Sequence, residues 1–202
     1  MSMIQINFKN QQSGFALLIT ILVLSVVVAV TLAIVELSLK QLKLSVDSTD
    51  SEIAFHAANA GLECARYVRR VHSDDFENGD DINIECFGDA ATVAAESSLG
   101  FSTSGVGANG AVYRYQHDIE WGTAPSVRCT SMDIIVVVAT STVTIGGSGA
   151  ATLKDRINGY ESDEKVCEAG ERCTIMSVVG YSSACGSISD PGVLRREILL
   201  EL

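Results

Sequence analysis

The feature that most constrains this chain is a long apolar run near its beginning. Residues 15–35 read FALLITILVLSVVVAVTLAIV and contain no Asp, Glu, Lys or Arg. As a helix rising 1.5 Å per residue, the run would be roughly 30 Å long, which matches the hydrocarbon core of a bilayer. A secretory signal peptide has a shorter apolar region and a small-residue cleavage site, which this run lacks. Residues 15–35 are therefore predicted to be a membrane-spanning helix.

The cysteines indicate the compartment of the rest of the chain. All six follow the apolar run, and an even number of cysteines favours disulfides in an oxidising compartment. Zinc is disfavoured because the closest pair, Cys167 and Cys173, has neither zinc-ligand spacing nor a nearby histidine. The disulfide candidates are Cys64, Cys86, Cys129, Cys167, Cys173 and Cys185. Their connectivity stays open, although Cys167 with Cys173 is favoured because a short loop closes easily.

The helical pattern continues beyond the apolar run. Residues at three- and four-residue intervals from Leu39 to Val68 are mostly apolar, and charged residues lie between them. No Pro interrupts the stretch, and its first Gly is Gly61. We therefore expect one helix over residues 15–70, with an amphipathic second half at 36–70 that packs one stripe on a domain.

The rest of the chain, residues 71–202, reads as a β-rich head. Residues 73–90 are acidic and 97–110 are Gly/Ser-rich, so both are expected to be loops, and the acidic stretch lacks the spacing of a calcium loop. Val, Ile, Thr and Tyr predominate in the segments that follow. The predicted strands are 82–87, 112–121, 129–145, 153–160, 174–182 and 195–202. A long helix followed by an antiparallel sheet is an α+β fold.

Motifs for chemistry are weak in this sequence. GVGANG at 105–110 matches a dinucleotide fingerprint, but a strand-like segment follows it where the fingerprint requires a helix. His56, His72 and His117 belong to no catalytic or metal-binding pattern, and Trp121 is expected to anchor the sheet. We expect no enzyme activity, cofactor or metal. The net charge of -11 argues against a nucleic-acid partner.

The N-terminal residues resemble a known protein family. Gly14-Phe15, after a short hydrophilic leader and before an apolar helix that becomes amphipathic, resembles the class III signal of type IV pilins and pseudopilins. The stretches SEIAFHAANAGLECARYVRR, VVGYSSAC and RREILLEL look like parts of PilX-type minor pilins. The resemblance implies that prepilin peptidase removes residues 1–14 on the cytoplasmic side and methylates Phe15.

The resemblance also implies a location and partners. The chain would be stored in the cytoplasmic membrane as a single-pass protein, and an assembly platform would then add it to an extracellular pilus with other pilin subunits. A role in DNA uptake stays open. In this family most major pilins carry Glu at the fifth mature position, where its carboxylate can pair with the N-terminal amine of a neighbouring subunit, whereas this chain has Ile19 there. An unpaired charge in an apolar filament core costs several kcal/mol, so a subunit without a neighbour above it can dispense with that Glu.

Two alternatives to the minor-pilin interpretation stay open. The missing Glu also looks like the K-type minor pseudopilin of type II secretion. A plain single-span membrane protein with an extracellular binding domain would keep residues 1–14.

Overall fold

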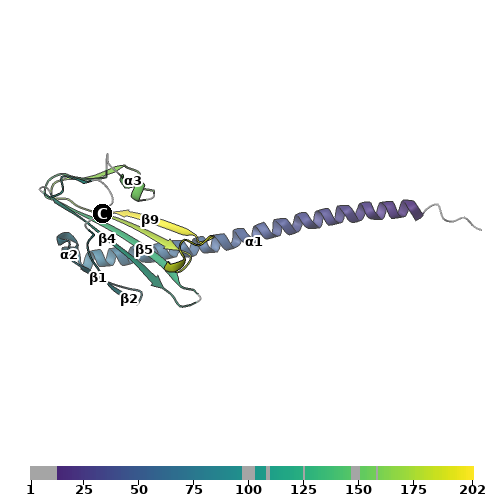
Figure 1. Cartoon of the computed structure of the whole chain (residues 1–202), viewed down its shortest axis with the longest axis horizontal. Helices are drawn as coiled ribbons and strands as arrows, with labels where there is room; N and C mark the ends of the chain where they lie inside the picture. The colour runs from purple at the N-terminus through teal and green to yellow at the C-terminus, as the bar shows by residue number, and fades with distance from the viewer. Residues whose placement is uncertain (1–12, 97–102, 108–109, 125, 147–150, 158) are drawn as a thin grey trace, which may run out of the picture. The chain divides into compact units, whose positions relative to one another are not determined.

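The computed structural model describes residues 13–96, 103–107, 110–124, 126–146, 151–157 and 159–202 (Figure 1). It has the predicted α+β architecture, in which a long N-terminal helix packs on antiparallel sheet. The helices are α1 (Ser13–Val71), α2 (Ser73–Asn78) and α3 (Leu153–Arg156), with a 3-10 turn η1 (Cys185–Ser187). The strands are β1 (Ile82–Cys86), β2 (Asp89–Val93), β3 (Thr103–Ser104), β4 (Gly110–Trp121), β5 (Arg128–Ala139), β6 (Val143–Gly146), β7 (Glu164–Cys167), β8 (Arg172–Tyr181) and β9 (Arg195–Glu201).

The chain divides into two compact units, Met1–Asp47 and Ser48–Leu202. In its described part, the first unit is the apolar beginning of α1. The second unit, called the head below, contains the rest of α1 and all the strands of the described residues. The predicted helix over residues 15–70 is confirmed, since α1 is continuous from Ser13 to Val71. The leader residues 1–12 lie outside the described residues.

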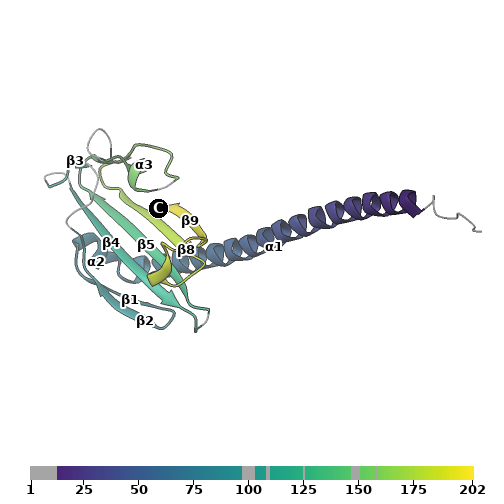
Figure 2. The ribbon, with the colours of Figure 1, turned by 45° about the vertical axis from the view of Figure 1, so that its right-hand side comes forward.

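The head is built on a four-stranded antiparallel sheet with the order β4-β5-β8-β9. Figure 2 shows these strands side by side, with the β1-β2 hairpin beyond β4. A smaller sheet has the order β3-β6-β7. Of the expected strands, 82–87, 112–121, 174–182 and 195–202 are confirmed as β1, β4, β8 and β9 with slightly shifted ends.

The helix meets this sheet through small side chains. The α1 residues Ala54, Ala57, Ala58 and Ala65 are fully buried. A Cβ on Gly61 would lie 2.8 Å from Val178 Cγ1 of β8 and would also collide with Thr130 of β5. The amphipathic prediction is therefore confirmed for the end of the stripe, where Ala57, Cys64 and Val68 are buried. It is wrong for Leu39, Leu42 and Val46, which are exposed.

Strand β5 lies at the centre of the head and is buried on both faces. Ile134 and Val136 belong to the core between the large sheet and α1, whereas Ile135 and Val137 belong to a second core on the opposite face. The second core also contains Ile145 of β6 and Leu153 of α3. This arrangement explains the unbroken apolar run of β5, since neither face needs polar side chains.

Three disulfides connect these elements, and all six cysteines are paired. Cys64 of α1 is bonded to Cys86 of β1, and Cys129 of β5 to Cys185 of η1. Cys167 of β7 is bonded to Cys173 of β8, as the sequence favoured. In each case the two elements joined by the disulfide are not neighbouring strands of one sheet.

Several predictions about the middle of the chain were wrong. The expected strand 153–160 begins as the helix α3, whose capping box is formed by Thr152 and Asp155. The expected strand 129–145 is two strands in different sheets, β5 and β6. The expected acidic loop at 73–90 begins with the helix α2, because Phe76 enters the core, and it overlaps the correctly predicted strand β1. The expected Gly/Ser loop contains the short strand β3, and residues 97–102 and 108–109 lie outside the described residues.

Candidate membrane-spanning segment and surfaces of the head

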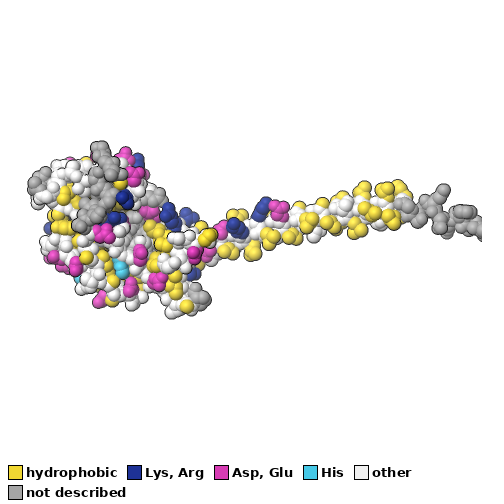
Figure 3. All heavy atoms as spheres, in the orientation of Figure 1, with side chains coloured by type: hydrophobic (Ala, Val, Ile, Leu, Met, Phe, Trp, Pro, Cys, Tyr) yellow, Lys and Arg dark blue, Asp and Glu magenta, His cyan; other side chains and the backbone are white. Residues whose placement is uncertain are grey.

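The first unit presents an apolar surface along α1. The helix from Phe15 contains an 18-residue window with a mean hydropathy of 3.1, and none of that window is buried within the chain. Large side chains are exposed throughout, for example Phe15 at 70% and Leu32 at 65%. In Figure 3 hydrophobic side chains cover this part of the helix. The segment is long and apolar enough to cross a membrane.

The polar side chains of residues 15–35 satisfy their own hydrogen bonds. Thr20 Oγ1 donates to the Leu17 carbonyl at 2.8 Å, and Ser25 Oγ donates to the Leu22 carbonyl at 2.8 Å. Thr31 Oγ1 donates to the Val27 carbonyl at 2.6 Å. These three are the only hydroxyl, amide or charged side chains in the run. Since a bilayer core offers no water to a lone hydroxyl, such local pairing lowers the cost of placing the segment there.

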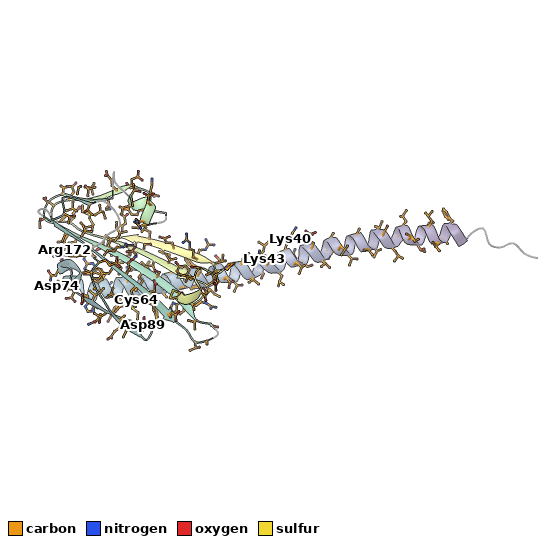
Figure 4. The ribbon with its side chains drawn as sticks, in the orientation of Figure 1. Lys40, Lys43, Cys64, Asp74, Asp89 and Arg172 are labelled. Carbon is orange, nitrogen blue, oxygen red and sulfur yellow. A yellow bond between two sulfur atoms is a disulfide. The ribbon has the colours of Figure 1, made fainter. Side chains whose placement is uncertain are left out.

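Charged side chains of α1 begin directly after the apolar run. Glu36 accepts a hydrogen bond from Lys40 Nζ at 2.9 Å, and Lys43 follows one turn later. Lys40 and Lys43 leave the helix on the same side (Figure 4). The exposed Leu37, Leu39 and Leu42 lie between these charges, and the exposed Leu44 and Val46 follow them. This part of the helix therefore suits a boundary between an apolar and an aqueous environment.

The predicted processing residues lie at the beginning of α1. Gly14 is the second residue of the helix, and Phe15 is the first whose side chain is described. Ile19 lies one turn further and is 43% exposed. The helix thus brings Gly14, Phe15 and Ile19 into one short segment, while the six cysteines lie in the head.

The end of α1 is fixed to the head by an arginine and carboxylate cluster. Arg69 Nη2 lies 3.3 Å from Glu77 Oε1 of α2, and Arg172 Nη1 of β8 lies 3.2 Å from the same oxygen. The Arg69 guanidinium also lies over the Phe76 ring, 5.5 Å from its centroid. Because Glu77 joins two arginines from different elements, the cluster holds the end of α1 and α2 against the sheet. The acidic stretch therefore has a structural role that composition did not indicate.

The histidines do not converge on a site. His72 Nδ1 lies 2.9 Å from Asp75 Oδ2, and His117 Nε2 lies 3.3 Å from Asp89 Oδ2. His56 is exposed, 3.7 Å from Glu52. Within the described part of the chain, no group of three or more His, Cys, Asp or Glu side chains could hold a metal ion. Trp121 anchors the sheet as predicted, since its Nε1 donates to Thr130 Oγ1 at 3.0 Å.

A cavity of about 500 Å³ lies between the β7 region and β9. Its wall contains Tyr160, Lys165, Leu199 and Glu201. Lys165 Nζ lies 2.8 Å from Glu201 Oε2, and hydrogen bonds from Lys165 and then Tyr160 lower the pKa of Glu201. Burial, followed by the bond to Glu201, raises the pKa of Tyr160. These groups bind one another and join β7 to the edge of the large sheet.

The β1-β2 hairpin carries a feature that the sequence prediction missed. Phe87 has a φ of 56° and is 51% exposed in the turn between the strands. Its ring centroid lies 5.9 Å from that of Trp121. The sequence prediction placed Phe87 at the end of the strand 82–87 and predicted no strand at 89–93, so it did not indicate a turn at Phe87.

The comparisons with known proteins leave the family open. No model of a protein family, no curated protein and no solved structure matches this chain.

Proposed function

We propose that this chain is a structural minor subunit of a type IV pilus, held in the membrane and incorporated into, or capping, the filament through α1. The observation that carries the proposal is the continuity of α1. Its beginning has the apolar surface of a membrane span, and its end is an integral part of a disulfide-bonded head. One helix can therefore link a head outside the cell to a membrane or filament core.

The physical chemistry of the apolar run supports a change of environment. Lipid tails and apolar neighbouring helices solvate such a surface about equally well, so its transfer changes little hydrophobic free energy. The internal hydrogen bonds of Thr20, Ser25 and Thr31 are kept in both environments. Little would then oppose extraction of the helix by an assembly motor.

Gly14, Phe15 and Ile19 supply the finer part of the proposal. Prepilin peptidase would cut between Gly14 and Phe15 on the cytoplasmic side, and Phe15 would be methylated. Ile19 stands where most major pilins have a Glu carboxylate. This supports a position of the chain in the filament at which no other subunit lies above it. The same residue favours a second candidate, a K-like minor pseudopilin of a type II secretion system.

The test is to shear surface filaments from intact cells and to identify their subunits by mass spectrometry. The proposal expects the chain, beginning at Phe15, in the sheared fraction. Recovery of the chain only from membranes, with residues 1–14 retained, would support a plain single-span protein. Loss of secreted enzymes on deletion, with surface pili intact, would favour the pseudopilin.

A further inference from the structure

The last strand of the chain, β9, is the most weakly buried strand of the large sheet. It lies at the edge of the sheet and pairs with β8 (Figure 2). None of the residues 181–202, all of which the structure describes, is buried, whereas β4, β5 and β8 each contain several buried residues. Segments with few buried contacts open at a lower free energy than the core of a domain. We therefore expect β9 to detach before any other strand of the large sheet.

The disulfides leave β9 free to move. Cys185 is the last cysteine of the chain, and its bond to Cys129 fixes the chain to β5 at that point. Residues 186–194 then lead to β9, and when extended they span up to roughly 30 Å. The strand can therefore leave the sheet, and reach a neighbouring molecule, without the breaking of a covalent bond.

Two side-chain contacts on β9 hold it at the beginning of the strand. Arg196 Nε donates to Ser51 Oγ of α1 at 2.8 Å, and Glu197 Oε1 accepts from Ser177 Oγ of β8 at 2.7 Å. A hydrogen bond of this kind contributes about 1 kcal/mol. These bonds therefore set the position of β9 in the sheet without preventing its release.

The edge of β8 that β9 covers is apolar on both faces. Met176 and Val178 belong to the first core and Ile175 to the second, and all three are almost completely buried. Leu200 of β9 packs against the first core and Leu199 against the second. An uncovered apolar edge with unpaired backbone groups is a template for another strand. The strand that fits it best has apolar side chains on both faces, as β9 itself has.

We propose that β9 is an exchangeable strand, and that the β8 edge it leaves binds β9 of a second copy of this chain. Two copies are then linked by exchanged strands. The exchanged strand makes the same contacts as before, including that of Glu197 with Ser177, so the main cost is the entropy of association. The proposal goes beyond the filament role and does not depend on it.

Hydrogen exchange of single amides in the full-length protein, held in maltoside micelles, tests the release of β9. The N–H groups of β8 point alternately to its two neighbouring strands. The Thr174 N–H donates to the Leu202 carbonyl, so the Met176 N–H also faces β9. The N–H groups of Ile175 and Ser177 face β5. The first set should exchange roughly tenfold faster than the second or more. Equal protection of both sets would overturn the proposal.

Crosslinking of a salt bridge tests exchange between copies. Lys165 Nζ of β7 lies 2.8 Å from Glu201 Oε2 of β9, and a carbodiimide joins such a pair as an amide with loss of water. Unlabelled and isotope-labelled chains are mixed in equal amounts, incubated at high concentration and crosslinked. About half of the Lys165–Glu201 crosslinks should then join a labelled to an unlabelled peptide.

The control for this experiment is the pair Lys154 and Asp163, which lies 3.8 Å apart and outside β9. Its crosslinks should stay within one copy. The proposal is overturned if the Lys165–Glu201 crosslinks also stay within one copy. Equal mixing in both pairs would overturn it as well, because it would show non-specific association.

Variants of two neighbouring arginines connect exchange to the release of β9. Arg196→Ala removes the bonds to Ser51, so mixed crosslinks should form roughly fivefold faster. Arg195→Ala is the matched control, because Arg195 is exposed on the same strand, and the rate should stay within about twofold of the parent. Equal rates in the two variants would contradict the proposal.

Discussion

Gly180 of β8 lies against the backbone of α1, where a Cβ would come within 2.8 Å of Ala57 Cβ and would collide with the Ala54 carbonyl oxygen. The helix therefore approaches the large sheet as closely as it does because Gly180 has no side chain.

The first prediction follows from this contact. Gly180→Ala should destabilise the head by about 2 kcal/mol or more, because backbone atoms of α1 must move to admit the methyl group. Gly186→Ala is the matched control, since a Cβ there meets nothing within 4 Å and the midpoint should stay unchanged. Urea unfolding of both variants measures the difference. Equal stability of the two variants would show that α1 does not pack closely on β8.

The second prediction concerns the disulfides, whose sequence separations are 56, 22 and 6 residues. A crosslink that closes a longer loop restricts the unfolded chain more, so removing the bonds singly should cost about 4, 3 and 2 kcal/mol in that order. Paired Cys→Ser variants, compared by denaturant unfolding, test the order. The largest loss for Cys167–Cys173 would contradict this entropic account.

The third prediction concerns alkaline unfolding. Burial raises the pKa of Tyr115 to about 12, and its hydroxyl donates to the Asp80 carbonyl at 3.0 Å. An unfolded tyrosine has a pKa of about 10. The folded state therefore holds this proton more tightly, and the resulting stability is present below about pH 10 and lost as the pH rises towards about 12. The loss should be on the order of 2 to 3 kcal/mol.

Tyr115→Phe is the variant that tests this assignment. It keeps the ring contact with Phe76 but loses the hydroxyl, so it should cost about 1 kcal/mol at neutral pH and show a weaker loss between pH 10 and 12. Tyr67→Phe, at an exposed position, is the control and should behave as the parent chain. The same alkaline slope in Tyr115→Phe and the parent would show that another group causes the loss.

Residue pattern predicted the elements that depend on local periodicity. The uncharged run and its continuation predicted α1, enrichment in Val, Ile, Thr and Tyr predicted β4 and β8, and alternation predicted β9. These signals suffice because they lie in the residues of each element itself, whether it is buried on both faces, as β8 is, or exposed, as the beginning of α1 is.

Features that depend on tertiary contacts could not be predicted from the sequence. The acidic residues before the strand at 82–87 were predicted to be a loop, yet Phe76 is buried in the core and Glu77 joins two arginines. Leu153 was predicted to begin a strand, although the capping box of Thr152 and Asp155 is a sequence pattern that indicates the beginning of a helix. The Cys64–Cys86 and Cys129–Cys185 pairs link distant segments, so spacing alone did not specify them. Nor does any sequence pattern predict an exposed Phe87 at positive φ.

The fourth prediction concerns Ile19 and position in the filament. Ile19→Glu would place a carboxylate on the apolar surface of α1, which is costly without a partner. If no subunit lies above, recovery in sheared filaments should fall at least severalfold, while Ile19→Leu should leave it unchanged. Quantitative mass spectrometry of the sheared fraction gives the result. Increased incorporation of Ile19→Glu would instead indicate a neighbouring amine and a position in the shaft.

The central claim, that the chain is a processed pilin-type subunit, is tested most directly by intact-mass and N-terminal peptide analysis of the native protein. The account predicts a mature chain that begins with methylated Phe15, and retention of the leader in Gly14→Val. The account would be contradicted if the native protein kept residues 1–14. The masses of the native protein and of Gly14→Val would then differ only by the substituted side chain.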